Sequence, residues 1–210
     1  MIKVAICAVV RFIEQQVFPH FLAFVLHLRL RSQAESIRQM PFFVDTPEEW
    51  ITEKQIEELR KDFDHEANRS YRIVEKGRAG LFMIGVTIAL ITALLGFSGT
   101  NKLEHDELIV LLIGVAYLVL SAICLTAAVN VRQRNGFFLD DLVEAKESRL
   151  RLVVFSRQQL IRDYFYYGKL NQKMTTIVAN YVSASFDGMR NGIILIGVFF
   201  AMVMLRVHWT

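Results

Sequence analysis

Few residues of this chain have types and spacings that could carry catalysis or bind a metal ion. The five histidines are scattered along the sequence, at His20, His27, His65, His105 and His208. A run of Asp64, His65 and Glu66 imitates a ligand cluster, but consecutive helical residues do not share a face. Asp140 and Asp141 meet the same objection and suit a helix N-terminus better. The sequence has no P-loop, GxGxxG or GxSxG motif. We therefore expect no enzyme activity, no metal and no cofactor.

Basic residues interleaved with aromatic ones suggest a second kind of chemistry, the binding of phosphate groups. They occur in "RSYRIVEKGR" and "RDYFYYGK", but the formal net charge of the chain is only +3, which argues against direct nucleic-acid binding. Anionic lipid headgroups explain juxtamembrane basic residues more simply, while nucleotide phosphates and partner docking are the alternatives. The residues concerned are Arg69, Arg72, Lys76, Arg78, Arg132 and Arg134.

Two long apolar runs are the main feature of the hydropathy pattern, and the helices that they predict must hold the basic residues that flank them. The chain has 210 residues, of which 53% are hydrophobic. Residues 79–98 and 107–131 each match the roughly 20 residues that cross a bilayer as a helix. A soluble fold would have to bury both runs, and the remaining chain is too short and too charged to do so. We expect both runs to be transmembrane helices, with the lipid bilayer as the first partner.

The assignment of a third apolar run, residues 191–206, is less direct because it is short. It lies between Arg190 and Arg206, whose long side chains can reach the membrane interface and extend the span. We favour a third transmembrane helix; a hairpin tip and an interfacial helix are the alternatives.

Residues 1–45 begin like a signal peptide but do not continue as one. Lys3 and the apolar start fit that class, whereas Arg11 and Glu14 interrupt the apolar stretch and no small-residue cleavage site follows. We expect a retained, membrane-associated segment, formed by a pair of surface helices on either side of Pro19. A further transmembrane segment is the alternative.

Positive charge predicts the orientation of the first two spans, because loops rich in Lys and Arg stay in the cytoplasm. Basic residues lie before the first span and after the second, while the loop between the spans has only Lys102. The loop should therefore face outward. The sequence predicts a multi-pass protein of the cell membrane, which in a bacterium is the inner membrane.

The cytoplasmic segments, residues 46–78 and 137–189, are expected to be helical. Thr46 and Pro47 fit a helix N-cap and first position. An apolar stripe then recurs at three- and four-residue spacing, and residues 137–189 offer a matching stripe, with Gly168 as a point where that helix can end. The stripe residues are Ile56, Leu59, Phe63 and Tyr71 on the first segment and Leu142, Val153 and Leu160 on the second. The predicted fold is an all-α membrane protein, an antiparallel transmembrane hairpin extended by long cytoplasmic helices.

A row of small residues lies inside the first span, at Gly85, Ala89 and Ala93. Four-residue spacing of small residues lets another helix approach closely. The other helix belongs either to the same chain or to a second copy, so a homo-oligomer is one expectation. The polar residues within the first two apolar runs are not ionisable, so they offer no candidate for a proton relay; they are Thr87, Thr92, Ser121, Thr126 and Asn130.

Together, these features resemble a known family. A basic residue and glycine stand at the mouth of the first span (Lys76, Gly77, Arg78), and "NQK" follows the long helix (Asn171, Gln172, Lys173). Residues 54–190 are similar to the SLATT-like two-transmembrane effectors of bacterial anti-phage systems, which include the membrane effectors of Pycsar, CBASS and retron systems. The resemblance implies a protein that a cyclic nucleotide or a released sensor protein triggers to oligomerise and disrupt the inner membrane, causing growth arrest or cell death.

Two parts of the chain depart from that pattern. The apolar C-terminus from Gly192 exceeds a two-span hairpin, and residues 1–50 do not resemble a soluble sensor. Sensing would then belong to a partner protein or to the helical cytoplasmic region. The competing interpretation is a non-enzymatic membrane scaffold or a subunit of a transporter complex.

Overall fold

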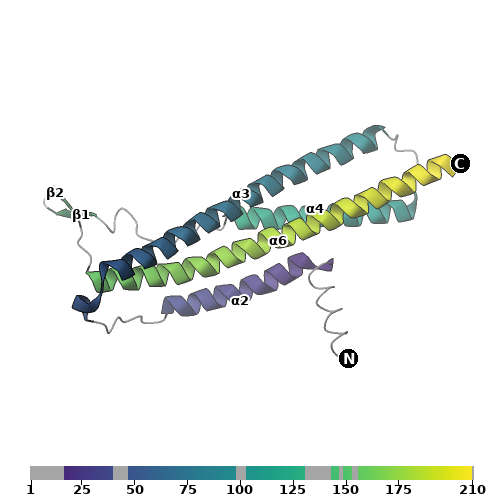
Figure 1. Cartoon of the computed structure of the whole chain (residues 1–210). Helices are drawn as coiled ribbons and strands as arrows, with labels where there is room; N and C mark the ends of the chain where they lie inside the picture. The colour runs from purple at the N-terminus through teal and green to yellow at the C-terminus, as the bar shows by residue number, and fades with distance from the viewer. Residues whose placement is uncertain are drawn as a thin grey trace, which may run out of the picture. The chain divides into compact units, whose positions relative to one another are not determined.

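A computed structural model describes residues 17–39, 47–97, 103–130, 143–146, 149–152 and 156–209 of the chain. Its elements are α2 (Pro19–Gln39), the short 3-10 helix η2 (Glu48–Trp50), α3 (Glu53–Phe97), α4 (His105–Asn130), strands β1 (Val143–Lys146) and β2 (Arg149–Leu152), and α6 (Arg157–Trp209) (Figure 1). Three helices, α3, α4 and α6, are long and apolar enough to cross a membrane. The prediction of a helical protein with three such segments is confirmed.

Helix α3 begins later than the sequence suggested. Gln55 N–H donates to Thr52 Oγ1 over 3.3 Å, and Thr52 N–H donates to Gln55 Oε1 over 2.9 Å. This reciprocal capping box satisfies two backbone donors at the first turn. The predicted start at Thr46 and Pro47 is wrong, because Pro47 precedes only η2; Thr46 lies outside the described residues. Residues 46–78 and 79–98, predicted separately, contribute to one helix of 45 residues.

Helix α6 is a single element of 53 residues. The predicted end at Gly168 is wrong. A glycine inside a helix costs about 1 kcal/mol relative to alanine but keeps the backbone hydrogen bond, and residues 157–209 contain no proline to interrupt it. The third apolar run is therefore the continuation of the helix that starts at Arg157.

Residues 143–146 and 149–152 form paired strands where a helix was predicted. Strands β1 and β2 pair antiparallel, with Val143 opposite Leu152 and Glu144 opposite Arg151. The sequences VEAK and RLRL alternate apolar and polar residues, which is the period of a strand and not of a helix. Leu142 and Val153, which we expected on the cytoplasmic stripe, lie outside the described residues.

Pro19 is the first residue of a helix. Helix α2 runs from Pro19 to Gln39, and proline suits the first position because its missing N–H would have no helical partner. The predicted partner helix before Pro19 falls largely on residues 1–16, outside the described residues.

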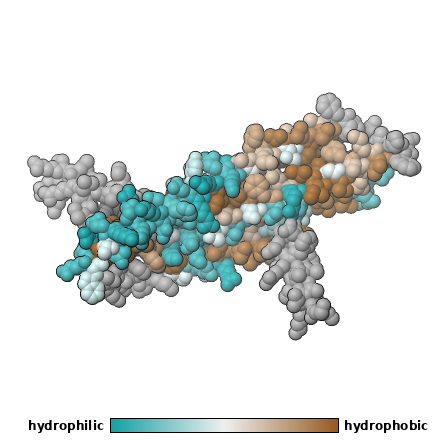
Figure 2. Space-filling model, viewed as in Figure 1, coloured by the Kyte–Doolittle hydropathy of each residue, from teal (hydrophilic) through white to brown (hydrophobic). Residues whose placement is uncertain are grey.

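The chain divides into two compact units. Unit 1 comprises Met1–Leu28, Ile73–Val131 and Ile177–Thr210, and unit 2 comprises Arg29–Arg72 and Arg132–Thr176. Unit 1 thus collects the apolar parts of all four long helices. In Figure 2 the hydrophobic surface gathers over the unit 1 parts of α3, α4 and α6, and the hydrophilic surface over unit 2.

Glycines allow the helices of unit 1 to pack closely. A Cβ at Gly80 of α3 would lie 2.9 Å from Leu125 of α4, and one at Gly192 of α6 would lie 2.9 Å from the carbonyl oxygen of Gly114. Leu118 and Phe199 are almost completely buried nearby. Most of the apolar surface nevertheless faces outward, because only 17% of the most apolar window of α3, 33% of that of α4 and 28% of that of α6 is buried.

In unit 2 the apolar stripe of α3 meets α6. Ile56, Leu59 and Phe63 are half-buried, as is Leu160 of α6. The ring of Phe63 meets that of Tyr164 edge-on, with centroids 5.8 Å apart, a favourable aromatic geometry. Tyr71, which we expected on the covered stripe, is 56% exposed.

Arg157 fixes the start of α6 in unit 2. Its backbone N–H donates to the carboxylate of Glu48 over 2.9 Å, while its guanidinium donates to the carbonyl oxygen of Ile51 and to Glu53 over 3.2 Å each. One residue thus ties the first turn of α6 to the start of α3 and to η2.

Candidate functional site

A buried polar cluster joins α2 to α4 inside unit 1. His20 Nε2 lies 3.1 Å from Ser121 Oγ, and Ser121 is completely buried. The hydroxyl of Ser121 donates to the carbonyl oxygen of Tyr117 over 2.8 Å. Because a hydroxyl has a single hydrogen, His20 Nε2 must be the donor towards Ser121. This arrangement selects the tautomer of His20.

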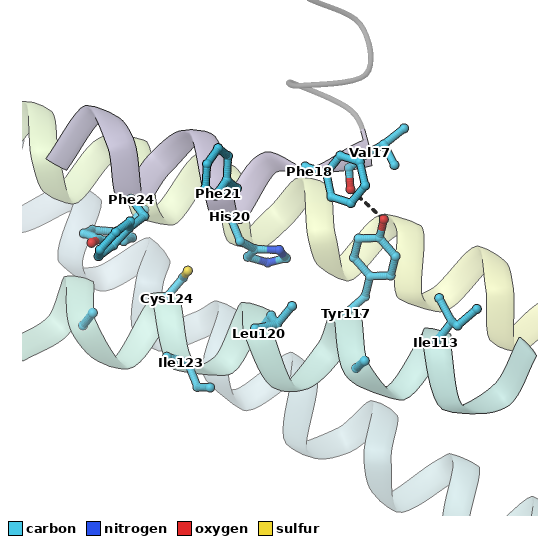
Figure 3. A pocket seen from close by; sticks show the side chains of 13 residues that line it. Val17, Phe18, His20, Phe21, Phe24, Ile113, Tyr117, Leu120, Ile123 and Cys124 are labelled. Atoms are coloured by element: carbon cyan, nitrogen blue, oxygen red, sulfur yellow. Dashed lines mark hydrogen bonds between the residues drawn. The ribbon is translucent and has the colours of Figure 1, made fainter. Parts of the chain in front are cut away.

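A second hydrogen bond fixes the start of α2 on the same helix. The hydroxyl of Tyr117 donates to the carbonyl oxygen of Val17 over 2.6 Å (Figure 3). The two bonds join residues that are about a hundred positions apart in the sequence. They account for polar groups that would be costly to leave unpaired among apolar side chains.

Gly188 of α6 makes room for this cluster. A Cβ at this position would overlap the His20 ring and lie 2.6 Å from Ser121 Oγ. Any side chain here would therefore displace His20. We call His20, Tyr117, Ser121 and Gly188 the His20 cluster. Further along α2, the centroid of the His27 ring lies 5.4 Å from that of Tyr181 on α6.

An apolar groove of about 620 Å³ runs beside the His20 cluster, between α2 and α4. Phe18, Phe21 and Phe24 form its α2 wall, and each is more than half exposed. Figure 3 shows Phe18 close to Tyr117 of α4 and Phe24 pointing towards α4, whereas the ring of Phe21 overlies the α2 ribbon. The α4 wall consists of Ile113, Ala116, Tyr117, Leu120, Ile123, Cys124 and Ala127, and Val17, His20 and Tyr181 complete the lining.

A buried ion pair joins the first turn of α4 to the last turns of α6. Glu107 is 2% exposed, and its Oε2 accepts from the backbone N–H of Glu104 and from the Arg206 guanidinium, each over 3.0 Å. Glu104 also lies 3.9 Å from Arg206. We expected Arg206 to reach towards the membrane interface; the structure instead gives it a carboxylate partner within the chain.

The row of Gly85, Ala89 and Ala93 is exposed. A Cβ at Gly85 would meet nothing within 4 Å. Close helix contacts occur at other glycines, Gly80, Gly114, Gly188 and Gly192. No described side chain packs closely on Gly85, and contact of this row with a second copy stays a prediction.

The four juxtamembrane basic residues that the structure describes all lie on α3, and two of them pair with carboxylates of the same helix. Arg69 pairs with Glu66 over 3.4 Å. Further along α3, Arg78 pairs with Glu75. Arg72 and Lys76 are exposed. Arg132 and Arg134 lie outside the described residues.

Among the described residues, no group of three or more His, Cys, Asp or Glu side chains is placed to hold a metal ion. No protein-family model, curated protein or solved structure matches the chain. Its function must therefore be argued from the His20 cluster, the groove, the ion pair and the exposed surface of α3.

Proposed function

We propose that this chain is a membrane effector of bacterial anti-phage defence, which assembles with further copies in the inner membrane and permeabilises it. The observation that carries the proposal is the outward surface of α3. Only 17% of its most apolar window is buried, and the small-residue row of Gly85, Ala89 and Ala93 lies on its exposed part. A row of this kind favours close contact with another helix in a bilayer.

In this proposal, α3 and α4 form the transmembrane hairpin with its loop outside, and α6 crosses in the same direction as α3. The distribution of Lys and Arg supports this orientation. Unit 2 is then cytoplasmic, where a cyclic nucleotide or a sensor protein could act on it. Such a signal must bind the active packing more tightly than the inactive one in order to shift the population.

Assembly through α3 would explain how a chain of this kind acts without catalysis. Association of helices in lipid relies on close van der Waals packing, since the lipid chains are as apolar as the side chains. A bulky side chain at Gly85 would hold the partner helix away. It should not disturb the protomer, because the space around Gly85 is open.

The test is inducible expression in bacteria with a membrane-potential dye and colony counts. The wild-type chain should depolarise the membrane and reduce the colony count. Gly85→Leu should reduce both effects and also reduce crosslinking between protomers. Val86→Leu is the matched control, because Val86 is the neighbouring residue and is also exposed.

Two results would contradict the proposal. Expression of the wild-type chain in the membrane without depolarisation would favour the alternative of a scaffold or transporter subunit. Equal depolarisation by Gly85→Leu and wild type, at matched membrane levels, would remove the small-residue row from the mechanism.

A further inference from the structure

We propose that the groove between α2 and α4 binds one acyl chain of a membrane phospholipid. The inference needs α4 to cross the bilayer but does not depend on the effector role. It is argued from the depth of α2, from the chemistry of the groove walls and from the size of the groove.

Contacts within unit 1 place the apolar part of α2 along one half of α4. Its first residues reach the middle of α4, where Tyr117 bonds to Val17. Near the other end of this stretch, His27 meets Tyr181, and the next residue of α6, Val182, lies with Val129 around Gly77. Residues 17–28 therefore extend from the middle of α4 to its Asn130 end. Most of the groove therefore lies along the half of α4 that ends at Asn130.

The groove walls provide no polar group that calls for a polar ligand. Of the lining side chains with polar atoms, His20 bonds to Ser121 and Tyr117 bonds to Val17, while Cys124 and Tyr181 are buried. The open surface consists of rings and aliphatic chains, with Phe21 69% exposed, Ile123 59% and Leu120 46%. In a bilayer such a surface must be covered by hydrocarbon, since water is absent at this depth.

The groove is too narrow for a whole helix to lie inside it. The groove follows α4 from Ile113 to Ala127, which is about 21 Å at 1.5 Å per residue. A groove of about 620 Å³ over this length has a mean cross-section of about 30 Å², whereas a helix of about 10 Å diameter has one of about 80 Å². A single extended hydrocarbon chain is narrow enough to lie in it.

The test uses tryptophan fluorescence and a phospholipid with brominated acyl chains. In a background of Trp50→Phe and Trp209→Phe, Leu120→Trp places a reporter in the groove. Val119→Trp is the matched control, because Val119 has the same depth and nearly the same exposure, 47% against 46%, but does not line the groove. The purified, delipidated protein in detergent is titrated with the brominated lipid.

We expect saturable quenching of the Leu120→Trp reporter at a single lipid per protomer, several-fold stronger than the quenching of the Val119→Trp control at the same lipid content. Adding Ala116→Phe, which fills the groove, should lower the quenching of the Leu120→Trp reporter to that of the control. Ala116 is exposed, so this change should not disturb folding.

Equal quenching of the two reporters, rising only with the lipid fraction, would overturn the proposal and leave ordinary annular lipid. Absence of quenching at the Leu120→Trp reporter would also overturn it, since another protein segment would then cover the groove. Neither result would bear on depolarisation by the wild-type chain, so the lipid site and the effector role fail independently.

Discussion

The carboxylate of Glu107 is almost completely buried and accepts two hydrogen bonds. The stability of the fold should therefore depend on Arg206, which donates one of them. The carboxylate accepts from Arg206 and from the backbone of Glu104. Removing one partner of a buried pair leaves an uncompensated charge. We expect Arg206→Gln to lower the free energy of unfolding by about 2 kcal/mol, at the low end of the range for such pairs because Arg206 is partly exposed.

The double substitution provides the control for this prediction. Adding Glu107→Gln to Arg206→Gln removes the buried charge and keeps an acceptor for Glu104, so part of the lost stability should return. Denaturation in detergent, analysed as a double-mutant cycle, measures the coupling. Additive effects of the two substitutions would show that the two side chains do not interact.

Gly188 should be needed for docking α2, because any side chain there displaces His20. Gly188→Ala should expose the buried thiol of Cys124, which lines the groove beneath α2. In a Cys7→Ser background, maleimide labelling of the protein in detergent measures this exposure. Labelling should become faster in Gly188→Ala but not in Gly197→Ala, where an added Cβ meets nothing within 4 Å. Equal rates in both variants would mean that α2 does not depend on the His20 cluster.

The sequence could have indicated one part of this site and not the rest. Gly188 and Gly192 have the same four-residue spacing as the row that begins at Gly85. Two polar residues, Arg190 and Asn191, lie between them, so the sequence did not indicate a row of small residues there. Spacing predicts that a helix can approach, but not which row meets the same chain. The bonds of His20 to Ser121 and of Tyr117 to Val17 join distant residues and leave no local pattern.

At the scale of the helices, a substitution at Gly168 tests whether α6 is continuous or is divided into the two helices that the sequence suggested. Gly168 lies inside α6, and an added Cβ meets nothing within 4 Å. Gly168→Ala should therefore raise the free energy of unfolding by about 0.5–1 kcal/mol, through helix propensity and a less flexible unfolded chain. Thermal unfolding in detergent measures the change.

Gly114→Ala is the contrasting control, because an added Cβ there lies 3.0 Å from Ile196 and 3.2 Å from the carbonyl oxygen of Gly192. It should lower stability. If Gly168→Ala lowered stability as well, the helix would end near Gly168, as the sequence alone suggested.

Helix positions were more predictable than helix ends. Length and the absence of charge were enough to locate the apolar helices, whereas the start of α3 depends on a choice between two good caps. Thr46 with Pro47 and Thr52 with Gln55 both fit an N-terminus, and the reciprocal bonds of the second pair mark the observed one. The strand pair of residues 143–146 and 149–152 was not predicted. Each alternation of apolar and polar residues is only four residues long, and the longer helical spacing of apolar residues around it favoured a helix.

At the scale of the whole molecule, the boundary between the units coincides with basic residues of the sequence. Arg29, Arg72 and Arg132 stand at three of the four divisions, and the fourth follows Thr176. Basic residues mark the cytoplasmic ends of spans, so this division was implicit in the charge pattern. The docking of residues 17–28 against α4 was not, because a twelve-residue apolar stretch is too short to indicate a span.

The proposed function requires unit 1 to lie in the bilayer, with α3, α4 and α6 each crossing it. The decisive measurement is the accessibility of reporters placed at residues 105, 149 and 210 in intact cells. The account predicts that residues 105 and 210 are outside and residue 149 inside. A reporter at 105 on the same side as the one at 149 would contradict the hairpin of α3 and α4, and a reporter at 210 on the same side as the one at 149 would show that α6 does not cross.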